Sequence, residues 1–197
     1  MKISWIGPLA LAANLTAADV TVYVASDAPA PVSPAESIAR TMLRGAGVTV
    51  VWHDGTPRSE ASSSFLIRVA LADRTTPGRD PDSLAVSYPY AGATRGITIF
   101  YDRIRRRTER DPALERALLA HVLVHEITHV LQAIDRHSET GVMKAHWNRA
   151  DYAAMAHQPL PFTDEDVALI RQGLLLRSNQ KSLAIRSDHE GVPAGKP

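Results

Sequence analysis

Two histidines and a glutamate form the pattern H-E-x-x-H at His125, Glu126 and His129. On a helix, residues four positions apart lie one turn apart on the same face, so both imidazoles can reach one Zn²⁺ ion. Glu126 lies on the flank of that face, where its carboxylate can reach a water activated by the metal without being a ligand. The motif therefore predicts metal-assisted peptide hydrolysis, with two histidine ligands and Glu126 as general base.

The segment around this motif has the pattern of a buried helix. Asp111-Pro112 is typical of a helix start, with Asp as N-cap and Pro in the first turn, and few helix breakers follow as far as Ile134. A helix that is apolar on many sides is buried, and its polar side chains need partners. A metal ion would satisfy the histidines and the glutamate together. The apolar positions are Leu114, Leu118, Val122, Leu123, Ile127, Val130, Leu131 and Ile134.

A catalytic zinc site has three protein ligands and one open position. His137, just beyond the predicted end of the helix, is the preferred third ligand. Asp135 is the alternative. A carboxylate from further along the chain, such as Glu139 or Asp151, is a weaker option.

The residues after His137 have the pattern of a tight turn, Ser138-Glu139-Thr140-Gly141-Val142-Met143. Together with the motif, this stretch resembles the metzincin clan of zinc peptidases, and within it the matrixin-like branch. Those proteins have H-E-x-x-H-x-x-G-x-x-H, often followed by Ser, and then a turn whose Met lies under the metal. The residues that match in order are His125, Glu126, His129, His137, Ser138 and Met143.

Two features depart from the pattern of that family. Gln132 stands where the family has a helix-ending Gly, and the third histidine comes two residues late, at His137. The resemblance implies that Met143 supports the metal site from below without bonding to the metal.

The segments before the motif predict an α+β fold. The stretch 20–25 is rich in β-branched residues and predicts a strand, and 48–52 predicts a second strand. Between them, Ser33-Pro34 predicts the start of a helix that ends at Gly45, with Ser33 as N-cap and Pro34 in the first turn. Strand, helix and strand with short links predict a parallel pair. Further strands are predicted at 65–71, 84–88 and 96–101.

This order resembles the fold of metzincins. The resemblance implies a mixed, mostly parallel sheet with an edge strand, a buried active-site helix, and a small C-terminal subdomain with the Met turn and a helix. Residues 84–89 resemble the edge strand, and 162–167 resemble the start of the C-terminal helix, with acidic residues that favour the helix dipole. An extended peptide would add to the edge strand at Leu84, Ala85 and Val86.

Composition limits the class of protein. The 197 residues suffice for one domain with a substantial core, and 22 basic against 21 acidic residues give a formal charge of +1. That near-neutral charge gives no reason to expect nucleic acid as a partner. Cysteine is absent, which excludes disulfides and thiolate ligands. We expect a monomer that binds a peptide or protein substrate.

The two ends of the chain are predicted to lie outside the domain. Lys2, the apolar run 3–13 and small residues as far as Ala18 predict a secretory signal at 1–18, too short to span a membrane. The alternative for Ile3-Ser4-Trp5-Ile6 is a buried first strand. Polar residues at 178–197 predict a disordered tail, which leaves 19–177 as the domain.

Other polar residues near the motif have ordinary interpretations. His121 is expected at a polar helix position, and His146 and His157 on the surface. Tyr152 is expected to pack, although a tyrosine stabilises the tetrahedral intermediate in some metzincins. A solvated loop is expected for the basic run before the helix, namely Arg103, Arg105, Arg106, Arg107 and Arg110.

Two functions are compatible with these residues. The first is a secreted or periplasmic zinc-dependent endopeptidase, and the second is a non-catalytic, zinc-stabilised domain that binds peptides or proteins. A closed structural zinc site needs only its ligands. The carboxylate of Glu126 beside the first histidine therefore favours catalysis.

Overall fold

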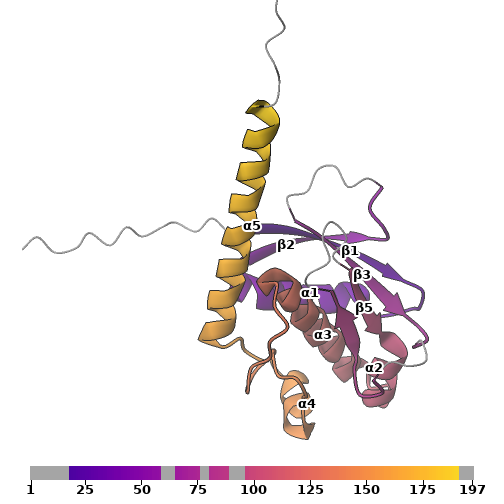
Figure 1. Cartoon of the computed structure of the whole chain (residues 1–197). Helices are drawn as coiled ribbons and strands as arrows, with labels where there is room; N and C mark the ends of the chain where they lie inside the picture. Colours follow the sequence, from indigo (N-terminus) through magenta and orange to yellow (C-terminus); the bar gives the residue numbers. More distant parts are fainter. Residues whose placement is uncertain (1–17, 59–64, 76–79, 89–95, 191–197) are drawn as a thin grey trace, which may run out of the picture.

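Five strands form one mixed sheet in the computed structural model, which describes residues 18–58, 65–75, 80–88 and 96–190 (Figure 1). Across the sheet the strands follow the order β2 (Val48–Asp54), β1 (Ala18–Ser26), β3 (Leu66–Ala72), β5 (Gly96–Phe100) and β4 (Ala85–Ser87). β1 pairs in parallel with β2 and β3, and β3 in parallel with β5. β4 pairs antiparallel with β5 and forms one edge, which confirms the predicted fold class.

One face of the sheet is buried, and the period of two along the strands selects its residues. Val20, Val22 and Val24 of β1 are almost fully buried, while the residues between them are partly exposed. In the register, Val22 lies opposite Ile67, and Val24 opposite Val69. The predicted strand, helix and parallel strand at the start of the domain are confirmed by this pairing and by that of β1 with β2.

The connecting helix α1 (Val32–Gly45) packs with its buried residues Ala35, Ala39 and Leu43 in the core. It begins at Val32 after Pro31, and no side chain caps its first turn. The prediction of Ser33 as N-cap is therefore wrong. Pro31 already has a φ of −75°, near the helical value, so the helix can start before the predicted cap.

The basic run before the active-site motif forms a short helix, α2 (Tyr101–Arg107), and not the expected loop. The chain turns from β5 directly into this helix. Tyr101 and Ile104, three positions apart, lie on one face and are buried in the core. Arg103 is also buried, because its guanidinium is hydrogen-bonded to backbone oxygens of residues 80 and 83.

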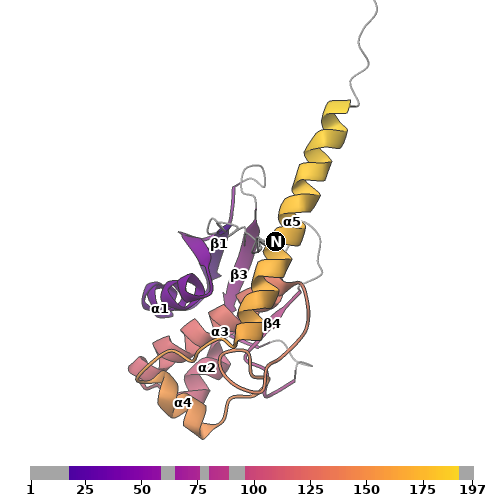
Figure 2. The same ribbon diagram turned by 90° about the vertical axis from the view of Figure 1, so that its left-hand side faces the viewer.

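The long helix α3 (Pro112–Gln132) lies across the buried face of the sheet and contacts α1, α4 (Arg149–Met155) and α5 (Asp164–Glu190) (Figures 1 and 2). The Asp111 side chain accepts hydrogen bonds from the first-turn N–H groups of Ala113 and Leu114, which confirms it as the N-cap. All side chains from 117 to 132 are buried. The polar groups of the motif are therefore held in the core, as predicted.

The C-terminal helix α5 begins as predicted, after Thr163. The Thr163 hydroxyl accepts from the N–H of Asp166, and the Asp166 carboxylate accepts from the N–H of Thr163, which is a reciprocal cap. The helix continues past Arg177 to Glu190 and projects beyond the sheet (Figures 1 and 2). The structure therefore differs from the expected disordered tail over 178–190, while 191–197 lie outside the described residues.

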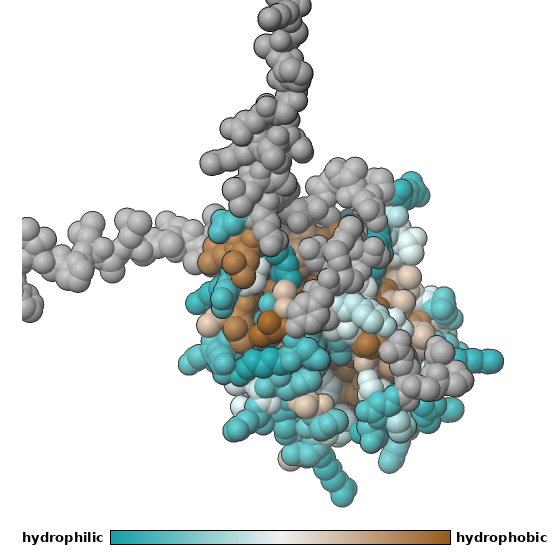
Figure 3. Space-filling view, in the orientation of Figure 1, coloured by the Kyte–Doolittle hydropathy of each residue, from teal (hydrophilic) through white to brown (hydrophobic). Residues whose placement is uncertain are grey.

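Most of the face seen in Figure 3 is polar, and apolar residues gather near the base of the projecting part of α5. Leu175 and Leu176 of this helix are 53% and 56% exposed. None of the helices in the described part of the chain is long and apolar enough to cross a membrane. The predicted signal at 1–18 lies outside the described residues, apart from Ala18 at the start of β1.

A close approach of backbones joins α5 to the end of α3. A Cβ atom on Gly173 would collide with the carbonyl oxygen of Leu131. One turn further along α5, the Arg177 guanidinium donates to the carbonyl oxygens of Val130 and Leu131, which have no partner within α3. Gly173 thus permits the contact that completes the hydrogen bonding of the last turn of α3.

Replacing this glycine should destabilise the protein. Gly173→Ala is expected to lower the free energy of unfolding by about 1–3 kcal/mol, because backbone atoms must move to admit the methyl group. Gly45→Ala is the matched control, since nothing lies within 4 Å of the added Cβ there. Urea unfolding followed by circular dichroism measures both variants, and equal stability of the two would contradict the close approach.

Candidate metal centre

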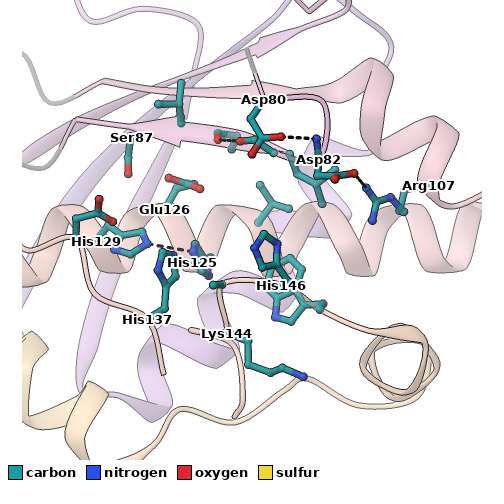
Figure 4. Close-up of a pocket in the computed structure, with 18 of the residues that line it drawn as sticks. Asp80, Asp82, Ser87, Arg107, His125, Glu126, His129, His137, Lys144 and His146 are labelled. Carbon is teal, nitrogen blue, oxygen red and sulfur yellow. Dashed lines mark hydrogen bonds and ion pairs between the residues drawn. The ribbon is translucent and has the colours of Figure 1, made fainter. Parts of the chain in front are cut away.

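Three histidines converge at one end of a cleft beneath the edge strand (Figure 4). One ligand atom from each of His125, His129 and His137 lies within 4.8 Å of the other two. The Nε2 atoms of His125 and His129 are 3.0 Å apart, and the ring of His137 is centred 5.2 Å and 4.9 Å from the other two rings. His125 and His129 are buried, whereas His137 is exposed to the cleft.

Backbone carbonyls fix the orientation of the two helix histidines. The Nδ1 atom of His125 lies 2.9 Å from the Val142 oxygen, and that of His129 lies 3.2 Å from the Ile134 oxygen. A carbonyl can only accept, so in each ring the proton is on Nδ1 and the lone pair is on Nε2. The two Nε2 lone pairs therefore face each other.

This arrangement fits a metal ion. Burial lowers the pKa of both His125 and His129 to about 4, so both rings are neutral near pH 7 and keep their lone pairs. Two lone pairs 3.0 Å apart repel unless a cation lies between them. A tetrahedral zinc with Zn–N bonds of about 2.0–2.1 Å would need an Nε2–Nε2 separation of about 3.3 Å, so a small adjustment suffices. The three histidines could thus hold one metal ion.

The fold distinguishes between the four candidates for the third ligand. His137 lies in the cluster, whereas Asp135 lines the cleft without being part of it. Asp151 is occupied elsewhere, because its carboxylate is 2.5 Å from the Lys144 amine. Glu139 is exposed and outside the cluster.

The end of α3 accounts for the late third histidine. Ala133, one residue after Gln132, has a φ of 56° and its N–H donates to the His129 carbonyl, which ends the helix with a left-handed residue. Gln132 stays helical and buried, and its amide donates to the Asp166 carbonyl. The helix therefore ends one residue later than the family pattern implies. The chain beyond it still brings His137 next to His125 and His129.

Met143 lies in a tight turn whose backbone holds His125. Val142 and Met143 are fully buried, and the Ser138 N–H donates to the Met143 oxygen at 2.7 Å. Gly141 has a φ of +76°, and a Cβ there would collide with the Pro161 carbonyl, so only glycine fits. The next carbonyl, that of Val142, accepts from His125. Support of the site by this turn thus runs through the backbone.

Asp166 links the segment that carries His137 to α5. Its buried carboxylate accepts from the Ser138 hydroxyl at 2.5 Å, from Arg136 at 3.2 Å and from the Thr163 N–H at 2.9 Å. Burial alone would raise the pKa of Asp166, but hydrogen bonds from Ser138, Thr163 and Arg136 outweigh it and hold the pKa below its usual value. Because Ser138 follows His137, this carboxylate restrains the third histidine.

Glu126 lies between the histidine cluster and the edge strand (Figure 4). Its carboxyl is buried, is hydrogen-bonded to Ser87 of β4, and lines the cleft. Burial raises the pKa of Glu126 above its usual value, although Ser87 and the nearby histidines oppose the shift. Glu126 is thus a carboxyl next to the histidine cluster but outside it.

The cleft has a volume of about 1010 Å³ and extends along β4. Leu84, Ala85 and Val86, the predicted substrate-binding residues, form one wall together with Ser87. The opposite wall comes from the segment after the Met143 turn and from α4. The helix α4 was not predicted from the sequence. Lys144, His146, Trp147 and Tyr152 lie on this wall.

The surroundings of His121 differ from those expected. His121 is fully buried, its Nδ1 donates to the Ala117 carbonyl, and its Nε2 accepts from the Leu160 N–H. Both nitrogens are used, so His121 joins α3 to the segment before α5 and is not an exposed helix residue. Its position among apolar residues, one turn before His125, was the available signal. Tyr152 packs against the core, as predicted, and its hydroxyl accepts a hydrogen bond from Arg107.

The remaining histidines differ less from expectation. His146 and His157 are both exposed, as predicted. His146 also lines the cleft, a position that depends on the path of the chain after the Met143 turn.

Comparison with known proteins identifies a solved structure with a similar fold. No family model matches the chain, and no curated protein matches it. The solved structure of archaemetzincin from Methanopyrus kandleri is similar, with a TM-score of 0.57 and 12% sequence identity over 79% of this chain and 96% of that one. At that identity the similarity shows the fold alone. The chain thus has a fold like that of archaemetzincin, while the narrower resemblance to matrixins receives no support.

The third ligand can be tested by metal content. We expect about one equivalent of Zn²⁺ in the purified protein, which chelation removes. His137→Ala should reduce zinc affinity far more than Asp135→Ala, because His137 alone lies in the cluster. Atomic absorption after dialysis against a graded chelator measures both. Greater loss from the Asp135 variant would contradict the assignment.

Asp166 should stabilise the fold in a manner that depends on pH. Asp166→Asn is expected to lower the free energy of unfolding by about 1–3 kcal/mol at pH 7, since three donors would lose their charged acceptor. The pKa of Asp166 is lowered in the folded state, so its contribution is present above about pH 4 and is lost as the pH falls through the folded pKa. Unfolding curves at several pH values should converge with those of wild type in acid.

Proposed function

We propose that the protein is a zinc-dependent peptidase in which His125, His129 and His137 hold the metal and Glu126 is the general base. One observation carries this proposal. A buried carboxyl lies between the three histidines and the wall of the cleft, outside the ligand set. A purely structural site would not need a carboxyl there, and an unused buried one would be costly.

The donor set suits zinc, because three neutral imidazoles form a usual ligand set for catalytic zinc. When bound, the ion would supply Lewis-acid polarisation of the scissile carbonyl and lower the pKa of water. Glu126 would accept the proton from the attacking water and pass it to the leaving amine. Burial keeps the pKa of Glu126 above its usual value, which favours the return of the proton.

Peptide binding would use the outer edge of β4, where the Ala85 carbonyl accepts from the Ser83 hydroxyl and keeps a second lone pair. The Phe100 N–H donates to the Leu84 oxygen and the Tyr88 N–H donates to the Gly96 oxygen, so the backbone groups of residues 84, 86 and 88 face β5. By alternation, those of Ala85 and Ser87 face the cleft. Extended peptide would therefore pair with Ala85 and Ser87, with Leu84 and Val86 shaping the wall.

Secretion or location in the periplasm is a further part of the proposal. It rests on the signal-like composition of residues 1–18. The mass of the protein recovered from its natural compartment would show whether residues 1–18 have been removed, as secretion requires.

Replacing the general base separates a peptidase from a binding domain. Glu126→Gln keeps the size of the side chain and should leave zinc bound, since Glu126 is not in the ligand cluster. Hydrolysis of casein should fall by at least about 10²-fold, because the proton acceptor is removed. Turnover and zinc content are measured on the same preparations.

Glu139→Gln is the matched control, because Glu139 is an exposed acid near the site and outside the cluster. It should retain wild-type activity. If the zinc-loaded wild type cleaves neither casein nor a broad peptide library, the peptidase proposal fails and the zinc-stabilised binding domain replaces it.

A further inference from the structure

The end of the cleft opposite His137 is crossed by one side chain. Arg107, the last residue of α2, has a guanidinium nitrogen 3.6 Å from the Asp82 carboxylate on the edge-strand side (Figure 4). It also donates to the Tyr152 hydroxyl of α4 at 3.3 Å. Asp82, Arg107 and Tyr152 all line the cleft. Their contacts join its two walls, so a bound chain that continued past this point would have to separate them.

The edge-strand side of this contact is held in place. The buried Arg103 guanidinium donates to the carbonyl oxygens of Asp80 and Ser83, and the Asp80 carboxylate accepts from the Asp82 N–H at 3.0 Å. Arg103 and Arg107 are one turn apart on α2. The same short helix therefore fixes the loop before β4 and presents Arg107 to the cleft.

Arg107 can exchange its present partners for a substrate group. Its side chain is 37% exposed and that of Asp82 is 76% exposed, and ion pairs so exposed contribute little stability. Arg107 is the sole arginine among the described residues that line the cleft, and Lys144 is held by Asp151 in a less exposed pair. A guanidinium can bind a carboxylate through two parallel hydrogen bonds, a geometry that neither the contact with Asp82 nor the one with Tyr152 has.

The direction of β4 determines which end of a peptide would reach Arg107. Along the chain, Asp82 precedes the strand at the Arg107 end, and Ser87 ends it beside Glu126. Antiparallel pairing is the commoner and slightly more stable mode. A peptide antiparallel to β4 would run from Ser87 towards Asp82, with its carboxyl terminus towards Arg107.

We propose that Arg107 binds the C-terminal carboxylate of the substrate, so that the protein prefers peptides that end at this end of the cleft and releases short C-terminal fragments. Hydrolysis adds one water across one peptide bond, leaving a new carboxyl on the N-terminal fragment and a new amine on the short one. The cleavage step rests on the proposed function, whereas carboxylate binding can be measured without it.

The test uses the full-length, zinc-loaded Glu126→Gln variant, so that bound peptides stay intact. An N-acetylated random hexapeptide library is offered as an equal mixture of free acids and C-terminal amides, and captured peptides are quantified by mass spectrometry. We expect acids to be enriched over amides by at least about tenfold. Adding Arg107→Gln should reduce that ratio to less than about threefold, and adding Arg107→Lys should give an intermediate value.

Arg106→Gln is the matched control. Arg106 is the neighbouring arginine of α2, pairs with Asp102 outside the cleft, and should leave the enrichment unchanged. Thermal melting confirms that each variant is folded. In the wild type, cleavage of the acid library should fall within a few residues of the carboxyl terminus.

Three results would overturn the inference. An acid preference that persists in Arg107→Gln would place carboxylate recognition elsewhere, such as at the metal. Enrichment of amides that carry Asp or Glu would show recognition of acidic side chains. Stronger capture of a matched library with free amino termini would place an ammonium at Asp80 and Asp82, with the peptide in the opposite direction. Acid enrichment through Arg107 without any hydrolysis by wild type would refute the peptidase function and leave carboxylate binding intact.

Discussion

The site depends on two buried imidazoles whose unprotonated nitrogens face each other across 3.0 Å. Neither ring can turn away without losing the hydrogen bond that its Nδ1 proton makes with a backbone carbonyl, one from Val142 and one from Ile134. Two lone pairs at this distance repel each other, so the arrangement is unfavourable until a cation lies between them. The constraint is imposed by two chain segments that both follow α3.

Those segments are in turn fixed by α5. Asp166 binds the hydroxyl of Ser138 and the N–H of Thr163, and the Gln132 amide binds the Asp166 carbonyl. Gly173 and Arg177 bring the same helix against the last turn of α3. The exit of α3, the residue after His137 and the start of α5 therefore form one hydrogen-bonded unit. The position of the third histidine follows from that unit, although its local sequence departs from the family pattern.

The other side of the cleft depends on α2. This helix buries Tyr101 and Ile104 while its Arg103 holds the loop before β4 and its Arg107 crosses to α4. The proposed chemistry and the proposed selectivity thus use separate parts of the molecule. Glu126 and the histidines lie at one end of β4, and Arg107 lies at the other, with the outer edge of the strand between them.

The sequence by itself determined the features that depend on local spacing. The pattern His125-x-x-x-His129, the cap at Asp111, the βαβ unit and the start of α5 at Thr163 follow from helix geometry, capping and periodicity, which act over a few residues. These local features were enough to predict the fold class, the two helix histidines and the carboxyl of Glu126 beside them.

Only the tertiary structure decided the features that join distant segments. The sequence favoured His137 over Asp135 only by resemblance, because the place of His137 depends on the exit of α3 at Ala133 and on Asp166. The burial of His121 depends on Leu160, and that of Arg103 on residues 80 and 83. These partners lie more than 15 residues away, and one sequence contains no signal for contacts formed only when the chain is folded.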